Sequence, residues 1–330
     1  MKRLVDDTGS ITFGLYEDRI DEVNYKDYRL ETPMGLPVPR AMSSALAKQF
    51  HFLGIIGPEL IIGMAVIDLG YLGSGFAYIH DRRTGRMTEA RKIQKGGRGA
   101  VIDPYPETGK SAFSSSSLSI EMERGRISAR ADDFEISAEL ALDQAKPLRI
   151  CTRTGYRGWT YTQKTTPVPL TGSVSLHGEK IDLTSPSYMA LTDWTCGFLR
   201  RETFWNWAST ASTLPDGKTL GLNLSCGVNE TSFTENAFWV DSARTKIDTV
   251  DFVFDRRDLM RVWRITSQDG KVNLTFHPEG RREEKMTAML ISSRFSQIVG
   301  VFDGTLHQDD GERIIVKNCP GFVEDHYAKW

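Results

Sequence analysis

The chain has 330 residues, of which 40% are hydrophobic and 25% are charged, a composition typical of globular proteins and unlike that of disordered ones. Its 41 Lys and Arg residues nearly balance its 43 Asp and Glu residues, which gives a formal net charge of −2. We therefore expect no global electrostatic attraction to nucleic acid or to an anionic membrane surface.

The N-terminal third contains one candidate helix and one long apolar stretch. Residues 41–49 can form two turns of helix, and little else in the chain has a helical period. The apolar stretch, residues 52–79, is interrupted by Pro58, Glu59 and Asp68, so it is not expected to span a membrane as a helix. It is predicted instead to form two short buried strands, residues 59–66 and 70–80.

Alternation of apolar and polar residues predicts antiparallel strands through the rest of the chain. It is clearest in three consecutive runs within residues 117–142, where it is typical of strands with one wet face. Further strands are predicted at residues 174–183, 219–228, 246–255, 260–267, 271–277, 294–302 and 313–317. Many short strands separated by Gly- and Asp-rich turns predict an all-β fold, either a sandwich or a barrel.

Cysteine and histidine spacing argues against several kinds of site. The four cysteines lack a Cys-x-x-Cys pair, and no His-x-His or His-Glu-x-x-His sequence occurs, so no metal site is expected. The glycine-rich segments do not fit a nucleotide-binding loop, and the arginine-rich segments alternate with acids. We therefore expect no cofactor and no nucleic-acid partner. Because the N-terminal residues MKRLVDDTGSITFG lack the apolar stretch of a signal peptide, a cytoplasmic protein with reduced thiols is expected.

The segment from residue 188 to residue 207 concentrates chemically versatile side chains. They are Tyr188, Asp193, Trp194, Arg200, Arg201, Trp205, Asn206 and Trp207. One interpretation is a plug of core residues between two barrels, tied together by buried ion pairs. The other places these side chains around an apolar ligand. Asp193, its pKa raised by burial, would then donate a proton, and the aromatic faces would stabilise a cationic intermediate.

A second cluster lies at the end of the sequence, where Glu324, Asp325 and His326 follow one another. A carboxylate beside an imidazole suits acid–base catalysis, because histidine titrates near neutrality and a carboxylate can fix its tautomer. Adjacent residues of a strand point to opposite faces, so Asp325 and His326 need not touch. The alternative interpretation is a polar tail that merely ends a strand.

Several of these residues resemble a block found in carotenoid 1,2-hydratase/AttH-like proteins. The block includes Tyr188-Met189, Asp193-Trp194, Trp205-Asn206-Trp207-Ala208 and Leu214-Pro215-Asp216-Gly217. The whole chain, including Glu324-Asp325-His326, is more similar still to an uncharacterised bacterial family, domain of unknown function 2804. This resemblance implies two lipocalin-like (calycin) β-barrels packed together, residues 1–228 and 229–330, with a hydrophobic ligand in or between them. By position, Asp193, Trp205 and Trp207 correspond to the block, whereas Asn206 replaces its middle acid.

Two functions follow as hypotheses. The first is a cofactor-independent enzyme that hydrates, isomerises or cyclises an isoprenoid, lipid or polyketide-like molecule. Asp193 is its candidate proton donor, and His326 or Glu324 is the partner. The second is a non-catalytic lipid carrier in which Arg200 or Arg201 pairs with an acidic head group. A barrel that fills its own interior and binds nothing is a third possibility.

Overall fold

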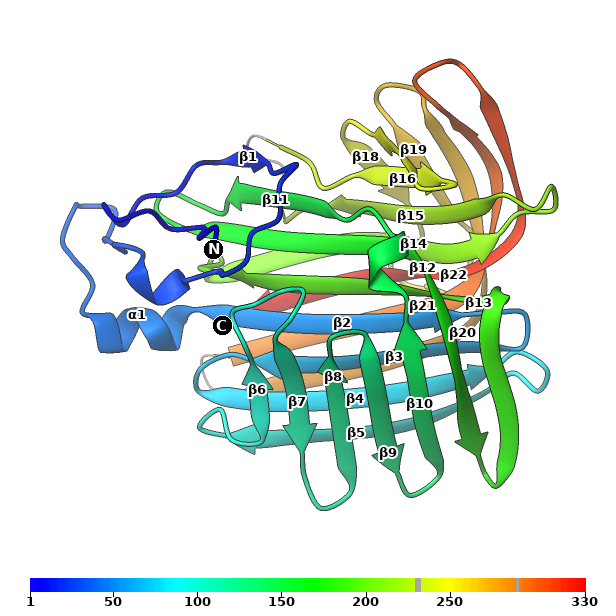
Figure 1. The fold of residues 1–330 in the computed structure, drawn as a ribbon, viewed down its shortest axis with the longest axis horizontal. Helices are drawn as coiled ribbons and strands as arrows, with labels where there is room; N and C mark the ends of the chain where they lie inside the picture. Colours follow the sequence, from blue (N-terminus) through cyan, green and yellow to red (C-terminus); the bar gives the residue numbers. More distant parts are fainter. Residues whose placement is uncertain (229–232, 289–290) are drawn as a thin grey trace.

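The computed structural model describes residues 1–228, 233–288 and 291–330, and it confirms an almost entirely β fold (Figure 1). Among these residues the helical elements are α1 (Arg40–Leu46) and two single 3₁₀ turns, Tyr25–Asp27 and Leu142–Gln144. The strands form two antiparallel sheets, one of 13 strands and one of nine. No helix in the described ranges is long and apolar enough to cross a membrane.

The N-terminal sheet curls on itself to enclose a first core. Its strands are β1 (Gly14–Leu15), β2 (Lys48–Ile56), β3 (Leu60–Asp68), β4 (Leu72–Asp81), β5 (Arg86–Lys95), β6 (Ala100–Ile102), β7 (Lys110–Ser114), β8 (Leu118–Glu123), β9 (Arg126–Ala131), β10 (Phe134–Leu140), β11 (Leu148–Arg153), β12 (Trp159–Leu176) and β13 (Glu179–Gly197). The order along the sheet is β5-β4-β3-β2-β13-β12-β10-β9-β8-β7-β6, and β11 pairs with β12. Strands β6–β10 therefore cross over β2–β5 (Figure 1).

The strands predicted from alternation at residues 117–142 are confirmed as β8, β9 and β10. Leu118, Ile120 and Met122 of β8 are buried in the first core, and the intervening Ser119 and Glu121 are exposed. One buried and one wet face produce this strict period of two. The neighbouring strands repeat the pattern, so these three strands form the outer wall of the first barrel.

Strands β3 and β4 confirm the predicted buried pair, and they are buried on both faces. Leu60, Ile62 and Met64 enter the first core, whereas Ile61 and Ala65 pack between the two sheets. A strand that is covered on both faces has no wet side, which explains the uninterrupted apolar sequence. Strands β2–β5 are therefore a wall shared by the first core and the interface between the sheets.

The predicted helix at residues 41–49 is shorter than expected. Helix α1 ends at Leu46 because Ala47 is extended, and Lys48 already begins β2. Strand β2 lies between β3 and β13, so its backbone pairs on both sides. Tertiary pairing overrides local helix propensity in the last residues of this segment.

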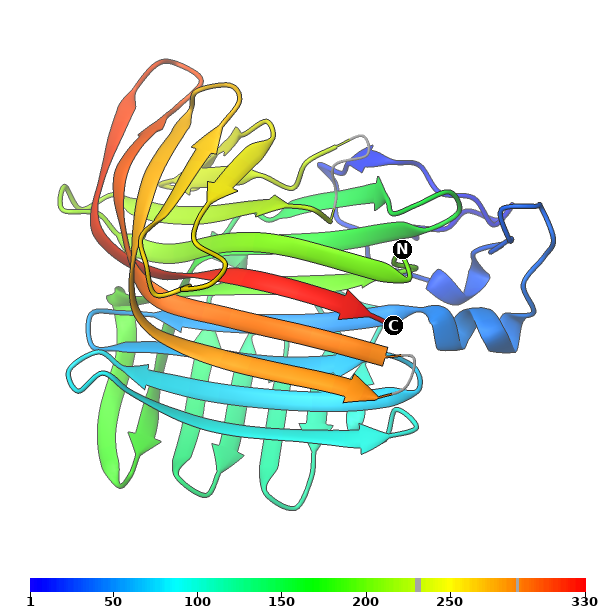
Figure 2. The ribbon, with the colours of Figure 1, turned by 180° about the vertical axis from the view of Figure 1, so that it is seen from behind.

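The C-terminal sheet contains three unusually long strands. Its members are β14 (Glu202–Thr213), β15 (Thr219–Cys226), β16 (Ala237–Val240), β17 (Ala243–Lys246), β18 (Val250–Val253), β19 (Trp263–Ser267), β20 (Val272–Ala288), β21 (Ile291–His307) and β22 (Arg313–Lys329). They follow the order β17-β16-β15-β14-β22-β21-β20-β19-β18. The ladder β20–β21 is irregular between Pro278 and Gly280, and β21–β22 between Phe302 and Gly304. Such irregularities bend strands. One half of each long strand joins the second core, and the other half lies over β2–β5 (Figure 2).

The two sheets divide the chain at the short connection between Gly197 of β13 and Glu202 of β14. The domain boundary expected after residue 228 falls at the start of residues 229–232, which lie outside the described residues. Strands β14 and β15 are hydrogen-bonded within the C-terminal sheet, to β22 and β16. The interface between the sheets is consequently built by β2–β5 and β13 on one side and by β14, β21 and β22 on the other.

Candidate active site

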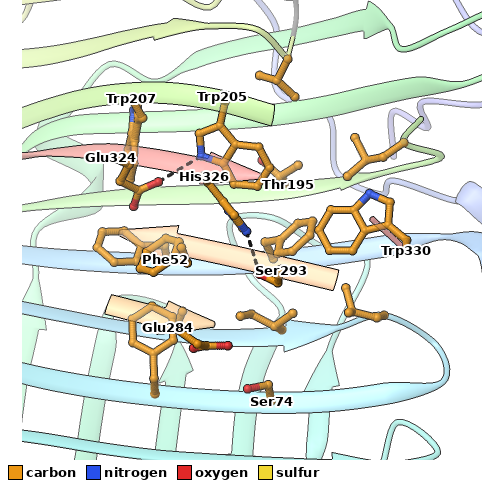
Figure 3. Close-up of a pocket in the computed structure, with 18 of the residues that line it drawn as sticks. Phe52, Ser74, Thr195, Trp205, Trp207, Glu284, Ser293, Glu324, His326 and Trp330 are labelled. Carbon is orange, nitrogen blue, oxygen red and sulfur yellow. Dashed lines mark hydrogen bonds between the residues drawn. The ribbon is translucent and has the colours of Figure 1, made fainter. Parts of the chain in front are cut away.

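A cavity lies between the N-terminal sheet, where β2–β5, β12 and β13 line it, and the strands β14 and β20–β22 of the C-terminal sheet (Figure 3). Aromatic rings supply much of its surface: Phe50, Phe52, Phe76, Trp205, Trp207, Phe295 and Trp330. Among the polar side chains that line it, Glu324 and His326 come from β22, Lys164 from β12, and Arg282 and Glu284 from β20. An apolar pocket with a few convergent polar groups is the usual form of a small-molecule site.

Glu324 is a buried carboxyl group held in place by two donors. Its side chain faces the cavity between Trp207 and Gln297, its register partners on β14 and β21. Trp205 Nε1 donates to Oε2 at 3.0 Å, and Gln297 Nε2 donates to Oε1 at 2.6 Å. Burial raises the pKa of Glu324 to about 7, against the lowering effect of the Trp205 hydrogen bond. This carboxyl group therefore holds its proton near neutral pH.

His326 lies two residues further along β22 and so faces the same side of the strand. Its ring centroid is 4.0 Å from that of Trp205 and 5.1 Å from that of Phe295. Nε2 lies 3.2 Å from Ser293 Oγ, and Nδ1 is buried with no hydrogen-bond partner among the described residues (Figure 3). Burial, with Arg282 nearby, lowers the pKa of His326 to about 3. The imidazole is therefore neutral at physiological pH, and one of its nitrogens is available to a ligand.

Asp193 faces the same interface, where it is a counter-ion of Lys164. The Lys164 ammonium is 2.6 Å from Asp193 Oδ2 and 3.3 Å from Glu235 Oε1. The hydroxyls of Thr162 and Thr195 donate to Asp193 Oδ1 at 3.1 and 2.9 Å. Burial alone would lower the pKa of Lys164, but its two carboxylate partners raise it overall. Lys164 is therefore a buried cation, placed 4.9 Å from the ring of Trp207.

A second set of buried charges lies where β20 meets β5. The Arg282 side chain is fully buried, with Nε 2.9 Å from Glu89 Oε1 and Nη2 3.3 Å from Glu284 Oε2. Arg91 also pairs with Glu284. The Arg282 guanidinium lies 4.0 Å from the ring centroid of Phe76. These contacts tie the two sheets together across the end of the cavity.

The structure brings together five of the residues singled out from sequence: Asp193, Trp205, Trp207, Glu324 and His326. Asp193 faces the interface between the sheets, and the other four residues line the cavity in that interface. They come from three strands, β13, β14 and β22, which places the two sequence clusters side by side. Lys164 and Arg282 complete the site, although no sequence motif marks either of them.

The remaining candidates lie away from the cavity, and strand parity explains three of them. Trp194 points into the first core, where it packs against Tyr161. Asn206 points into the second barrel, where its amide donates to Asp325 Oδ1 at 3.2 Å. Each is adjacent in sequence to a residue of the interface, so it projects from the opposite face of its strand. Asp325 is related to Glu324 in the same way, and it pairs with Arg294.

Tyr188, Arg200 and Arg201 also lie outside the lining of the cavity. Tyr188 is buried in the first core. Arg200 donates to the carbonyl of Gly227 at 3.0 Å, and Arg201 donates to the carbonyl of Trp330. Both arginines therefore hold backbone carbonyl groups near the ends of strands. Within the described part of the chain, no group of three or more His, Cys, Asp and Glu side chains is arranged to hold a metal ion.

The raised pKa of Glu324 predicts a pH-dependent stability that Glu324→Gln removes. The folded-state pKa of about 7 exceeds the ordinary value of 4.5, so between these values the folded chain keeps a proton that the unfolded chain has lost. The stabilising contribution of the protonated group is complete below pH 4.5 and is lost as the pH rises through 7. From pH 4.5 to 8, the free energy of unfolding of the wild type should fall by up to about 3 kcal/mol relative to the variant. Urea titrations at both pH values measure this difference, and equal pH dependence in the two proteins would contradict it.

Comparison with known proteins places this chain in a family. No curated protein matches it. The solved structure of an AttH-like protein from Nitrosomonas europaea is similar in fold, with 15% sequence identity and a TM-score of 0.55, covering 84% of this chain and 92% of that chain. Kievitone hydratase from Nectria haematococca (10% identity, TM-score 0.47, 96% and 97% covered) and CghA (9%, 0.48, 100% and 97%) are more distant. The likeness to the AttH-like structure concerns the fold alone, which consists of two antiparallel β-sheets packed together, as predicted. The family model "Domain of unknown function (DUF2804)" matches residues 1–330, so the chain belongs to this family over its whole length.

Proposed function

We propose that this chain is a cofactor-independent acid–base enzyme that adds water to an apolar alkene, or removes it, in the cavity between the two sheets. One observation carries the proposal: Glu324 is a buried carboxyl group with a pKa of about 7, set in an aromatic cavity. A general acid is most effective when its pKa lies near the working pH. His326, neutral and two residues away on the same face, supplies the complementary base.

The reaction balances with these two groups alone. Glu324 transfers its proton to one alkene carbon, and the positive charge that develops on the other carbon lies among aromatic faces such as those of Trp205 and Trp207. Water bonds to that carbon, and the resulting oxonium gives a proton to His326. An oxonium is a strong acid, so an imidazole of low pKa suffices as acceptor. Proton return from His326 to Glu324 restores the site, and the reverse sequence removes water.

Asp193 takes a supporting role in this proposal. Both of its oxygens already accept hydrogen bonds, one of them from the Lys164 ammonium. A carboxylate in that arrangement serves as the counter-ion of a buried cation. We therefore assign proton donation to Glu324, whose acidic proton is retained by burial, rather than to Asp193, which the sequence favours.

The test begins with native mass spectrometry of the gently purified protein and extraction of any bound molecule. That molecule, and the alkene citronellol, are then incubated with the protein in H₂¹⁸O and in D₂O. Incorporation of one ¹⁸O atom with one carbon-bound deuterium is the expected result. Deuterium without ¹⁸O would replace hydration by isomerisation or cyclisation. Unchanged molecules that bind stoichiometrically would contradict the enzyme and favour a carrier.

A further inference from the structure

Arg282 is buried in a way that leaves one of its donors unused. Nε and Nη2 pair with Glu89 and Glu284, and the guanidinium lies 4.0 and 5.3 Å from the ring centroids of Phe76 and Phe295. Both rings, and Arg282 itself, line the cavity. Nη1 has no hydrogen-bond partner among the described residues, although the side chain is fully buried.

An unpaired donor of a buried cation is energetically costly, because desolvation is not offset by a hydrogen bond. Guanidinium nitrogen atoms donate and never accept, so the group that satisfies Nη1 must be an acceptor. In a cavity with apolar walls, that acceptor is supplied most directly by a ligand oxygen. Arg282 and His326 both lie beside Phe295, whose ring centroid is 5.3 Å from the guanidinium and 5.1 Å from the centroid of the imidazole. A ligand oxygen bound to Nη1 would therefore lie at the same end of the cavity as His326.

The charges of the surrounding walls favour a neutral oxygen. The described cations of the two ion-pair sets are Lys164, Arg91 and Arg282. Their carboxylate partners are Asp193, Glu235, Glu89 and Glu284. Each of these three cations already contacts at least one carboxylate, so a ligand carboxylate would have to share a cation that is already paired. A carbonyl oxygen accepts a hydrogen bond without adding charge.

We propose that Arg282 Nη1 binds the carbonyl oxygen of an otherwise apolar substrate, which makes the substrate class an unsaturated ketone or aldehyde rather than a hydrocarbon or a fatty acid. The inference rests on the proposed function, since it assigns the substrate of the same cavity. Arg282 is in this account a specificity-determining residue, placed on β20 opposite the wall β2–β5.

The experiment compares ligands that differ in a single group. Titration calorimetry measures the dissociation constants of β-ionone, of the hydrocarbon in which a methylene group replaces its carbonyl, and of the carboxylate in which an oxygen atom replaces the methyl group of its acetyl group. We expect the wild type to bind the ketone about tenfold or more tightly than the hydrocarbon, as a hydrogen bond from a charged donor predicts. The carboxylate should bind more weakly than the ketone.

Two variants assign this preference to Arg282. Arg282→Met should lower ketone affinity to that of the hydrocarbon, and Arg281→Met, its neighbour on the outer face of β20, should leave the preference intact. If Arg282→Met alone does not fold, the double variant Arg282→Met with Glu284→Gln is used in its place. This double variant leaves the net charge of the ion-pair set unchanged.

The outcomes separate the inference from the proposed function. Equal affinity of the wild type for ketone and hydrocarbon, or a ketone preference that survives the loss of Arg282, would overturn the inference and leave the cavity intact as an alkene site. A carboxylate that binds as tightly as the ketone would overturn the assignment of a neutral oxygen. Failure to bind any of the three probes would contradict the proposed function together with the inference.

Discussion

Replacement of Glu324 by Gln is expected to slow turnover of a bound alkene by about 10²- to 10⁴-fold, the range in which a positioned general acid contributes. Glutamine keeps the size of the side chain, and its Oε1 can accept from Trp205 Nε1. Its NH2 group can donate to Gln297 if that amide turns its Oε1, which has no partner among the described residues, toward the new group. The variant has no acidic proton to transfer. Because the cavity walls are unchanged, we expect the loss in kcat, with ligand affinity altered little.

The matched control is Asp325→Asn. Asp325 is the next residue of β22, also a buried carboxyl group, but it faces the second barrel and pairs with Arg294 at 2.9 Å. This variant should retain turnover, because its carboxyl group does not reach the cavity. Glu324→Gln with wild-type kcat, or equal losses in both variants, would contradict the role assigned to Glu324. Single-turnover measurements of ¹⁸O incorporation provide the rate constants.

Replacement of Lys164 by Met is expected to reduce the free energy of unfolding by about 3–5 kcal/mol, the cost of removing one partner from a buried ion pair. The Lys164 side chain is 7% exposed, and its removal leaves Asp193 and Glu235 without their shared cation. Asp193 would then keep its negative charge between the sheets without the ammonium that lies 2.6 Å from it. Denaturant unfolding at constant pH measures the change.

Lys110→Met is the matched control for this effect. Lys110 pairs with Glu121 at 2.6 Å, but both side chains are largely exposed. Water screens such a pair, so its loss should destabilise the fold far less than the loss of Lys164. Asp193→Asn and Glu235→Gln, added to Lys164→Met, should recover part of the lost stability. A cost for Lys164→Met no greater than that of the surface variant would refute the ion-pair account.

The fold was largely predictable because each outer strand has one buried and one solvent-exposed face, which produces a regular alternation of apolar and polar residues. Alternation identifies β8, β9 and β10 almost to the residue, and the continuous apolar sequence identifies β3 and β4. Alternation alone does not give the length of β20, β21 and β22. Each of them changes surroundings halfway, from the second core to the interface over β2–β5, and its pattern of buried residues changes with it.

The candidate site was only partly predictable. Trp205, Trp207, Glu324 and His326 were identified because aromatic, acidic and imidazole groups are concentrated in two short segments. Trp194 and Asn206 belong to the same segments, but their side chains project from the opposite face of each strand. Alternation shows that neighbouring residues face opposite sides, but it does not show which side faces the cavity.

Lys164 and Arg282 could not be found by this approach. Each is a lone cation without a motif, and its importance follows from burial by the opposite sheet. Lys164 meets Glu235, and Arg282 meets Glu89, which is 193 residues away in sequence. Contacts of this kind depend on how two sheets pack, and local sequence patterns carry no information about them.

As the assigned proton donor, Glu324 must hold a proton near neutral pH inside the cavity. Infrared difference spectroscopy observes this directly, because a protonated carboxyl group has a carbonyl stretching band that an ionised carboxylate lacks. We predict a band that titrates with a midpoint of about pH 7, that Glu324→Gln abolishes and that Asp325→Asn leaves unchanged. A spectrum in which Glu324→Gln removes no protonated-carboxyl band at pH 6 would contradict the claim, and with it the assignment of Glu324 as the proton donor.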